Sequence, residues 1–582
     1  MGTISDKLMR IINTKEDIRQ ALISKGYDVP TSIPFKEYAK MILDLPCNAD
    51  PFPDIEGIVA RYSASGLTNE QMAANPVWVD KTGNGHDLQL KNFAWKGMSG
   101  VGGYVADIDE WGTNSTAAYF ERNSIKITAT FKENASLGLL YHNIKLRQSC
   151  VLKVTGIPEG CDAFLDDRLG NRFYMSEDGV YEIIPSNFLA EALYLSIEKY
   201  PERWYGSKLT IEQLPLYPGF ILSDGVDDFA VTEKELNFED TYTVYTAFIP
   251  FQNNPTRNMI LCGADSKKTF SMQYSSLVYV SFIAGNNYYI NADFVNGLNL
   301  FACKRNGNNI CIKNLLTNKV VTGTCGDWVE NAGLYYLWKN ATYASFAKAA
   351  IAGQTICNGY FSTDEDDEKV LNWYKKQYPW LFPDQAWTVV GKTNEDEDRA
   401  TIANITGNGN DLVLSNFGFA EGSGYNEEGE YAGYLVTDGV DDRVQDSSFK
   451  LNKDWTLVGE WVFLNQKATN AGITKPFSFA VYNRTTGLSL FINMGTSGIT
   501  IENVKSIKAI CSDGRIYFDD WSEMLISKDQ DITSSTSVLS IGFNGTAYAQ
   551  IAFKNLGIYN NQILSKDDCI KAYNYLQTLK SK

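Results

Sequence analysis

Histidine is almost absent from this chain, which has 582 residues but only His86 and His142. Its ten cysteines are scattered along the chain without any C-x-x-C pair. Histidines and paired cysteines supply most zinc ligands, and regularly spaced cysteines mark disulfide frameworks. The sequence therefore indicates neither kind of site, and we expect the cysteines to be small buried side chains.

Positive charge is also scarce, because 52 Lys and Arg stand against 69 Asp and Glu and leave a net charge of −17. Such a charge repels nucleic-acid phosphates and anionic membrane surfaces, so neither is an expected partner. No apolar run approaches the ~20 residues of a membrane-spanning helix, and the first residues lack the apolar core of a signal peptide. We expect no membrane insertion, and synthesis in a cytoplasm.

Short alternating runs such as "TVYTAFIPF" and "TLVGEWVFL" fill most of the chain after residue 53. Alternation with period two, rich in β-branched and aromatic residues, is typical of antiparallel sheets. The length exceeds the ~250 to 300 residues at which single cores stop growing. The sequence therefore predicts a mainly β protein of several domains.

An internal repeat is visible in two pairs of strings. "TGNGHDLQLKNF" at 82–93 matches "TGNGNDLVLSNF" at 406–417, an offset of 324 residues. "SDGVDDF" at 223–229 matches "TDGVDDR" at 437–443, an offset of only 214. The first copy therefore carries an insertion, predicted at 110–217, whose own strand-like runs suit a small β-sandwich.

Helices are predicted at three places. Residues 1–50 suggest two short amphipathic helices, which form either an attachment or oligomerisation module or a cap on the next domain. Each copy of the repeat also ends in an amphipathic helix with an acidic start, "STDEDDEKVLNWYKKQYP" and "SKDDCIKAYNYLQTLK". Negative charge stabilises a helix N-terminus, so we interpret these acidic runs as helix starts rather than metal ligands.

The acidic heptads at 223–229 and 437–443 have two interpretations. Calcium requires six to eight oxygen ligands, and the candidates are Asp224, Asp227, Asp228, Asp438, Asp441 and Asp442. Alternatively Asp224 makes an Asx hydrogen bond, Gly225 adopts a positive φ, and Val226 enters the core. The local turn is the favoured interpretation, no other cofactor is expected, and calcium remains the alternative.

Taken together, the "TGNG-x-DL" turn, the "DGVDD" turn and the closing "GIYNNQILSKDDCIKAYNYL" resemble the concanavalin A-like lectin/glucanase superfamily. The resemblance is to the laminin-G-like sandwiches of bacterial and phage surface proteins, over 54–383, interrupted by 110–217, and over 384–582. The leading segment, "KLMRIINTKEDIRQALISKGYDVPTSIPFKEYAKMI", is similar to that of structural proteins from phages of gut Bacteroidales. The resemblance implies two jelly-roll β-sandwiches behind a helical module.

A glucanase of this superfamily would need two carboxylates on one strand, about 5 Å apart for a retaining mechanism. The nearest string is "ADIDEWG", with Asp107, Asp109 and Glu110, but no acidic residue occupies 111–113. His86 is replaced by Asn410 in the second copy, so it reads as a turn residue, and no nucleophile elbow or P-loop is present. We therefore predict that the protein is not an enzyme.

Binding of host surface glycans is the function that the resemblance implies. Aromatic side chains in turn-like stretches are candidates for stacking on sugars, namely Trp204, Tyr205, Tyr288, Tyr289, Tyr425 and Tyr431. The expected setting is the virion surface, as a tail or head fibre attached to other virion proteins through residues 1–50. A homo-oligomer, and within that class a trimer, is expected. A capsule-glycan depolymerase and a purely architectural decoration protein are the alternatives.

Overall fold

In a computed structural model the chain divides into two compact units, Met1–Asp54 and Ile55–Lys582. The structure describes residues 52–581, so the helical module predicted at 1–50 lies outside the described residues. Within that span the description has gaps at 106–107, 114–115, 124, 134–137, 146–149, 184–191, 252–258, 265–269, 275–278, 284–288, 294–296, 328–332, 340–345, 408–409, 430, 447–448, 465–471, 476–478, 484–488, 495–496, 503–505, 527–538 and 544–546.

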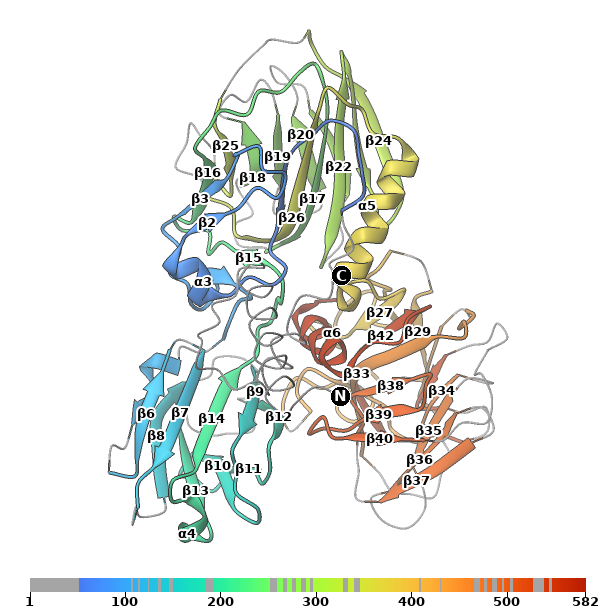
Figure 1. The fold of residues 1–582 in the computed structure, drawn as a ribbon. Coiled ribbons are helices and arrows are strands. Elements are labelled where there is room, and N and C mark those ends of the chain that lie inside the picture. The colour runs from blue at the N-terminus through green and yellow to red at the C-terminus, as the bar shows by residue number, and fades with distance from the viewer. Residues whose placement is uncertain are drawn as a thin grey trace, which may run out of the picture. The chain divides into compact units, whose positions relative to one another are not determined.

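Two eight-stranded antiparallel sheets form what we call the first sandwich (Figure 1). One sheet has the order β24-β23-β22-β17-β26-β15-β4, and β1 also pairs with β26. Its strands are β1 (Ile58–Ser63), β4 (Gly100–Val101), β15 (Ile221–Leu222), β17 (Thr241–Pro250), β22 (Asn299–Asn306), β23 (Asn309–Asn314), β24 (Lys319–Thr324) and β26 (Ala349–Asn358). The other has the order β2-β3-β16-β25-β18-β19-β20-β21, with β2 (Val77–Trp78), β3 (Leu88–Lys91), β16 (Phe229–Thr232), β18 (Met259–Ala264), β19 (Ser271–Tyr274), β20 (Tyr279–Ile283), β21 (Tyr289–Asp293) and β25 (Tyr335–Leu337).

A hydrophobic core lies between these two sheets because alternate residues of each strand point inward. Tyr242 and Val244 of β17 pack in one cluster with Phe282 of β20 and Leu337 of β25. The rings of Tyr242 and Phe282 meet edge to face, 6.4 Å apart. Since the two residues belong to opposite sheets, this contact marks the sandwich interior.

The second copy of the repeat, here called the second sandwich, has the same strand order. Its sheets run β30-β31-β42-β33-β38-β39-β40, with β27 paired to β42, and β28-β29-β32-β41-β34-β35-β36-β37. Their bounds are β27 (Gln385–Thr388), β28 (Thr401–Ile402), β29 (Leu412–Ser415), β30 (Gly424–Tyr425), β31 (Leu435–Val436), β32 (Arg443–Gln445), β33 (Trp455–Phe463), β34 (Gly472–Lys475), β35 (Phe479–Asn483), β36 (Ser489–Met494), β37 (Ser497–Glu502), β38 (Ala509–Cys511), β39 (Arg515–Tyr517), β40 (Glu523–Leu525), β41 (Ser540–Ile541) and β42 (Ile551–Asn560).

Two five-stranded sheets form a third layer pair, the inserted sandwich, between β4 and β15 of the first sandwich. Their orders are β11-β10-β13-β8-β5 and β12-β9-β14-β7-β6, and they enclose a core of their own. The strands are β5 (Gly112–Thr113), β6 (Ala118–Arg122), β7 (Lys126–Phe131), β8 (Gly138–Lys145), β9 (Cys150–Thr155), β10 (Asp162–Asp166), β11 (Arg172–Met175), β12 (Gly179–Ile183), β13 (Ala192–Glu198) and β14 (Lys208–Gln213). In the second sandwich a short connection joins the equivalent strands β30 and β31.

Helices are few in the described part of the chain: α3 (Asn69–Ala74), α4 (Pro201–Trp204), α5 (Asp364–Gln377), α6 (Lys566–Thr578) and the short 3-10 helices η1 (Ile108–Glu110) and η3 (Pro379–Leu381). None of these described helices has both the length and the apolar character needed to cross a membrane. The predicted mainly β fold built from sandwiches is confirmed. Of the nine cysteines described, all are free thiols and all but Cys311 are buried.

Candidate functional site

Each acidic heptad forms a tight turn whose aspartates accept hydrogen bonds from the backbone. In the turn at 223–229, Asp224 Oδ1 accepts from the Val226 amide at 2.7 Å, and Asp228 Oδ2 accepts from the Asp224 amide at 3.0 Å. Gly225 has φ +79°, which favours glycine. The predicted Asx hydrogen bond and positive φ are therefore confirmed.

The prediction that Val226 enters the core is wrong. Val226 and its counterpart Val440 are each 70% exposed, because the Asx hydrogen bond places the residue after the glycine at the tip of the turn. Within each DGVDD string the fully buried residue is instead the last aspartate, Asp228 or Asp442.

This buried aspartate also joins its turn to a neighbouring loop. The Ser99 side chain lies beside Asp228 and favours its carboxylate, and Ser99 Oγ accepts from the Ala94 amide at 2.8 Å. In the second sandwich Ser423 lies beside Asp442 in the same way, and Ser423 Oγ accepts from the Gly418 amide at 2.8 Å. The heptad is thus a structural element that both copies of the repeat share.

The three carboxylates of each turn lie within 4.8 Å of one another, as a cation site would require. Burial is the main reason that the pKa of Asp228 rises to about 7 and that of Asp442 to about 6. Two of the three carboxylates already accept backbone hydrogen bonds, so a calcium ion would have to compete with the turn and expel a proton.

Calcium titration is therefore expected to leave the melting temperature Tm within about 1 °C of its value without added cation, because an ion that does not bind adds no stability. Differential scanning calorimetry of the full chain checks this, with magnesium as the ionic-strength control. A calcium-specific rise that disappears in an Asp228→Asn, Asp442→Asn variant would instead establish a calcium site at these turns.

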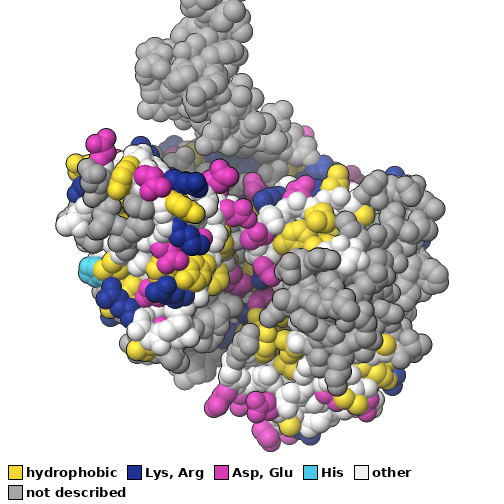
Figure 2. All heavy atoms as spheres, turned by 90° about the horizontal axis from the view of Figure 1, so that it is seen from below, with side chains coloured by type: hydrophobic (Ala, Val, Ile, Leu, Met, Phe, Trp, Pro, Cys, Tyr) yellow, Lys and Arg dark blue, Asp and Glu magenta, His cyan; other side chains and the backbone are white. Residues whose placement is uncertain are grey.

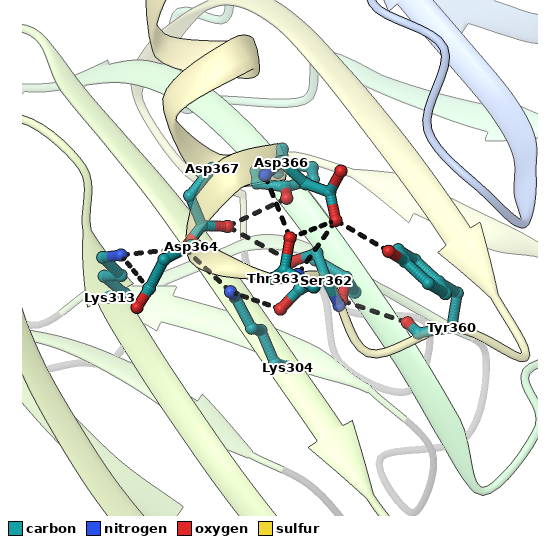
Figure 3. A network of polar contacts seen from close by, with 10 residues as sticks. Lys304, Lys313, Tyr360, Ser362, Thr363, Asp364, Asp366 and Asp367 are labelled. Atoms are coloured by element: carbon teal, nitrogen blue, oxygen red, sulfur yellow. Dashed lines mark hydrogen bonds and ion pairs between the residues drawn. The ribbon is translucent and has the colours of Figure 1, made fainter.

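The acidic start of α5 is a second cluster of carboxylates that could suggest a metal site. Its side chains instead make hydrogen bonds and ion pairs within the protein (Figure 3). Thr363 and Asp366 form a capping box at the helix N-terminus. The buried Asp367 accepts from Lys304 Nζ at 2.8 Å and lies 3.0 Å from Lys313 Nζ, so it pairs with β22 and β23. The predicted helix-start role of this acidic run is confirmed, and the ion pairs with two sheet lysines add to it.

Two of the six candidate sugar-stacking aromatics are not exposed, so that expectation is wrong for them. Trp204 is 1% exposed, since α4 turns its ring onto Phe131 at a centroid distance of 4.9 Å. Tyr425 is 2% exposed, and its hydroxyl donates to the Arg399 carbonyl at 2.8 Å.

The other four candidates do not form a common site. Tyr205 is half-buried on the inserted sandwich, and Tyr431 is half-buried on the second sandwich, edge to face with Tyr434. Tyr288 lies outside the described residues, and Tyr289 belongs to β21, with its side chain likewise outside the description.

A cleft of about 520 Å³ lies among the described residues. Its lining comes from β9 and β12 of the inserted sandwich, the segment 214–218, the loop after β39 and α6, and it includes Thr155, Val180, Pro215, Trp521, Lys571 and Asn574. Ligand pockets typically measure about 300–1,000 Å³ and combine apolar walls with a few polar groups. The cleft meets both criteria.

Asn574 is the most informative polar residue in this lining. It is 2% exposed, and its Nδ2 donates to the Pro215 carbonyl at 3.4 Å, whereas its Oδ1 has no partner among the described residues. Buried amide oxygens normally accept a hydrogen bond, so this oxygen is free to accept one from a ligand or a water.

Charged groups beside the cleft link the inserted sandwich to the second sandwich. Glu182 of β12 accepts from the Tyr573 hydroxyl of α6 and from Lys508 Nζ at 3.2 Å, and Lys508 Nζ also meets Tyr573 at 2.7 Å. Burial disfavours the ammonium, but Glu182 and Glu460 outweigh burial and hold the pKa of Lys508 above its ordinary value. A buried ion pair therefore connects the two walls of the cleft.

Sequence reasoning did not identify any residue of this cleft. Its walls come from 153–155, 177–180, 214–218, 520–522 and 566–574, which no local pattern connects. Trp521 shows the difficulty: it adopts φ +62° and packs on Tyr573 at 5.7 Å, which the surrounding letters "FDDWSEM" do not indicate.

One face of the molecule is drawn in Figure 2, where basic side chains are interspersed with acidic and hydrophobic ones. On the described part of this face they do not gather into a continuous basic patch.

No family model and no curated protein matches the sequence. Among solved structures, the chain is similar to a botulinum neurotoxin type C structure described as depending on two ganglioside molecules for cell entry, at 12% identity over 60% of this chain and 89% of that chain, with a TM-score of 0.25. A botulinum neurotoxin DC binding domain in complex with rat synaptotagmin II matches at 10% identity over 59% and 90%, with a TM-score of 0.25. The Emp47p carbohydrate recognition domain matches at 9% over 25% and 84%, with a TM-score of 0.18. Similarity at this level says nothing about the ligand of the present chain.

Proposed function

We propose that this protein is a non-catalytic, lectin-like glycan-binding protein of the concanavalin A-like superfamily, and that the cleft beside β12 and α6 is its sugar site. The observation that carries the proposal is the cleft itself, which places an unpartnered buried amide oxygen, Asn574 Oδ1, among apolar and charged side chains.

The chemistry of the cleft suits a carbohydrate. Sugars present C–H faces and hydroxyl groups, which call for apolar contacts next to hydrogen-bonding groups. Val180 and Pro215 supply apolar surface, Asn574 supplies an acceptor, and Lys571 supplies donors. Acidic and basic residues both occur in the lining, so a short neutral oligosaccharide is the ligand proposed.

A binding role is favoured over hydrolysis by the conformation of "ADIDEWG". The retaining mechanism would place two carboxylates on one strand, whereas Asp109 and Glu110 lie in the 3-10 helix η1. Glu110 has a side chain that is 72% exposed and lies 3.8 Å from Lys96 Nζ, so it is a solvated surface carboxylate.

The proposed setting is the virion of a Bacteroidales phage, as a tail or head fibre or another surface appendage. The support is the resemblance of the leading segment and of the paired sandwiches to such proteins. In this setting residues 1–50 attach the chain to other virion proteins, the chain forms a homo-oligomer, with a trimer as the proposed state, and the sandwiches face host glycans at the virion surface.

Substitution of Ser522 by tryptophan is expected to weaken glycan binding at least tenfold, because an indole on this exposed rim residue fills the cleft. Host capsule fragments on a glycan array identify the ligand, and titration calorimetry of the full chain then compares the wild type with Ser522→Trp. Ser522→Ala is the matched control, and it is expected to bind like the wild type.

Three outcomes separate the proposal from its competitors. Saturable binding without cleavage that Ser522→Trp abolishes supports it, whereas equal binding by Ser522→Trp moves the site away from this cleft. Release of reducing ends from capsule would show a depolymerase. Silence in both assays, together with assembly onto particles, would show an architectural protein.

A further inference from the structure

The two copies of the repeat fasten their closing helix to the sheet in chemically different ways. In the first sandwich the tie is the buried ion pair between Lys304 of β22 and Asp367 of α5, at 2.8 Å (Figure 3). Their side chains are 4% and 3% exposed. Asp367 lies four positions after the helix N-cap, Thr363.

The equivalent positions in the second sandwich follow from the strand register. Lys304 is paired with Thr243 of β17, and Cys511 of β38 is paired in the same way with Thr456 of β33. Thr243 Oγ1 accepts from the Ser362 amide at 3.0 Å, just before the N-cap of α5.

Thr456 Oγ1 makes the same contact, accepting from the Leu564 amide at 2.9 Å, just before the N-cap Ser565 of α6. Four positions after Ser565 stands Cys569. The pair Cys511 and Cys569 therefore replaces the pair Lys304 and Asp367.

The two thiols lie next to each other at the start of α6. Cys511 Sγ lies 4.0 Å from the carbonyl of Leu564, the residue before the N-cap, and both cysteines are fully buried. Interaction with the Cys569 thiol is the main reason that the pKa of Cys511 lies below its ordinary value, with the Thr456 side chain and the Arg515 guanidinium contributing. A thiolate at Cys511 is the nucleophile that thiol–disulfide exchange requires.

We propose that Cys511 and Cys569 form a disulfide that fixes α6 to β38 when the protein enters an oxidising medium. The oxidant is a low-molecular-weight disulfide. The Cys511 thiolate attacks one of its sulfurs and releases one small thiol as the leaving group, and the Cys569 thiol then loses its proton and attacks the mixed disulfide, which releases the second. Two protein thiols are oxidised to one disulfide, and one small disulfide is reduced to two small thiols.

The first turn of α6 offers the route for this reaction. Ser565, Lys566 and Asp567 are exposed and directly precede the turn that carries Cys569, so the sulfurs become accessible when the helix start frays. The bond closes a loop of about 60 residues, which restricts the unfolded chain more than a short loop would. The disulfide replaces a non-covalent contact between α6 and β38 by a covalent bond. This suits a protein that folds in a reducing cell and works outside it.

The test uses the full-length protein incubated with oxidised glutathione, then unfolded, alkylated and digested without reductant. A peptide pair joining Cys511 to Cys569 is expected in the mass spectrum, while Cys150 and Cys161, which are equally buried, remain alkylated. The transition of the second sandwich should rise by about 5 °C relative to protein kept in dithiothreitol.

Cys569→Ser should lose both the linked peptide and the rise while unfolding at the temperature of the reduced wild type. Full alkylation of Cys511 and Cys569 after oxidation, or their linkage to other cysteines, would overturn the proposal. Because the peptide map is read on the wild-type chain, this outcome does not depend on whether the serine variant folds.

Discussion

Asp367→Ala is expected to lower the free energy of unfolding of the first sandwich by about 3–5 kcal/mol, because it leaves two buried ammonium groups without their shared counter-ion. The carboxylate of Asp367 accepts from Tyr245 at 2.9 Å and Ser362 at 3.2 Å, in addition to its contacts with Lys304 and Lys313. No other carboxylate in this cluster is buried against both lysines, so the loss has no local replacement.

Hydrogen exchange measured by mass spectrometry checks this expectation within a single molecule. Peptides from α5, β22 and β23 should lose protection in Asp367→Ala, while peptides from the second sandwich serve as the internal reference. Asp364→Ala is the matched control, since Asp364 also contacts Lys313 Nζ, at 2.6 Å, but its side chain is 93% exposed. Unchanged exchange around α5 in Asp367→Ala would show that the ion pair contributes nothing.

The internal repeat made the inserted domain predictable from the sequence, because the two repeated strings lie next to strands that pair with each other. The "TGNG-x-DL" string runs into β3 and β29, and the DGVDD turn precedes β16 and β32. Since β3 pairs with β16, and β29 with β32, the unequal spacing requires extra chain between two strands that stay together. Turn chemistry is local, so the sequence alone carries it.

Side-chain exposure was harder to predict than fold class, because hydrophobicity does not state which side of an element faces solvent. The string "EKYPERWYG" looks like an exposed turn, yet α4 buries Trp204 and leaves Tyr205 half-buried. Val226 shows the opposite error, since the Asx turn exposes a residue that its type assigns to the core.

Contacts between residues far apart in the chain could not be predicted from the sequence, for a different reason. Asp367 meets Lys304 about 60 positions away, and the proposed sugar site unites Thr155, Trp521 and Asn574. Such groups come together only through strand order and register, which two residues in a linear pattern do not reveal.

The two sandwiches share strand order, DGVDD turns and capped closing helices. They differ in the pair of side chains that joins the closing helix to the sheet. An ion pair holds α5 in the first sandwich, and a thiol pair occupies the same place in the second. The threonines beside these pairs and their backbone contacts are retained, so both sandwiches hold the start of the helix at the same place on the sheet. The fold therefore determines where the closing helix contacts the sheet, but it does not determine which kind of side-chain interaction is made there.

Glu460→Gln should lower the free energy of unfolding of the second sandwich by about 3 kcal/mol at neutral pH, because it removes the charge that pairs with a buried lysine. Glu460 is 4% exposed, accepts from the Tyr434 hydroxyl and from Gln577 Nε2 at 2.6 Å, and lies 3.4 Å from Lys554 Nζ. Burial alone would raise its pKa, but Lys554 and then Lys508 outweigh burial and lower the pKa to about 2.

The pH dependence distinguishes this electrostatic role from a simple packing defect. Since the pKa of Glu460 falls from about 4.5 in the unfolded chain to about 2 in the folded one, its stabilisation is fully present above pH 4.5 and is lost as the pH falls toward 2. The difference in Tm between wild type and Glu460→Gln should therefore be largest near pH 7 and shrink steadily below pH 4.5. Calorimetry across this range tests it, with Glu523→Gln on the exposed face of β40 as the control. A difference that stays constant from pH 7 to pH 2 would mean that the carboxylate contributes through its shape and not its charge.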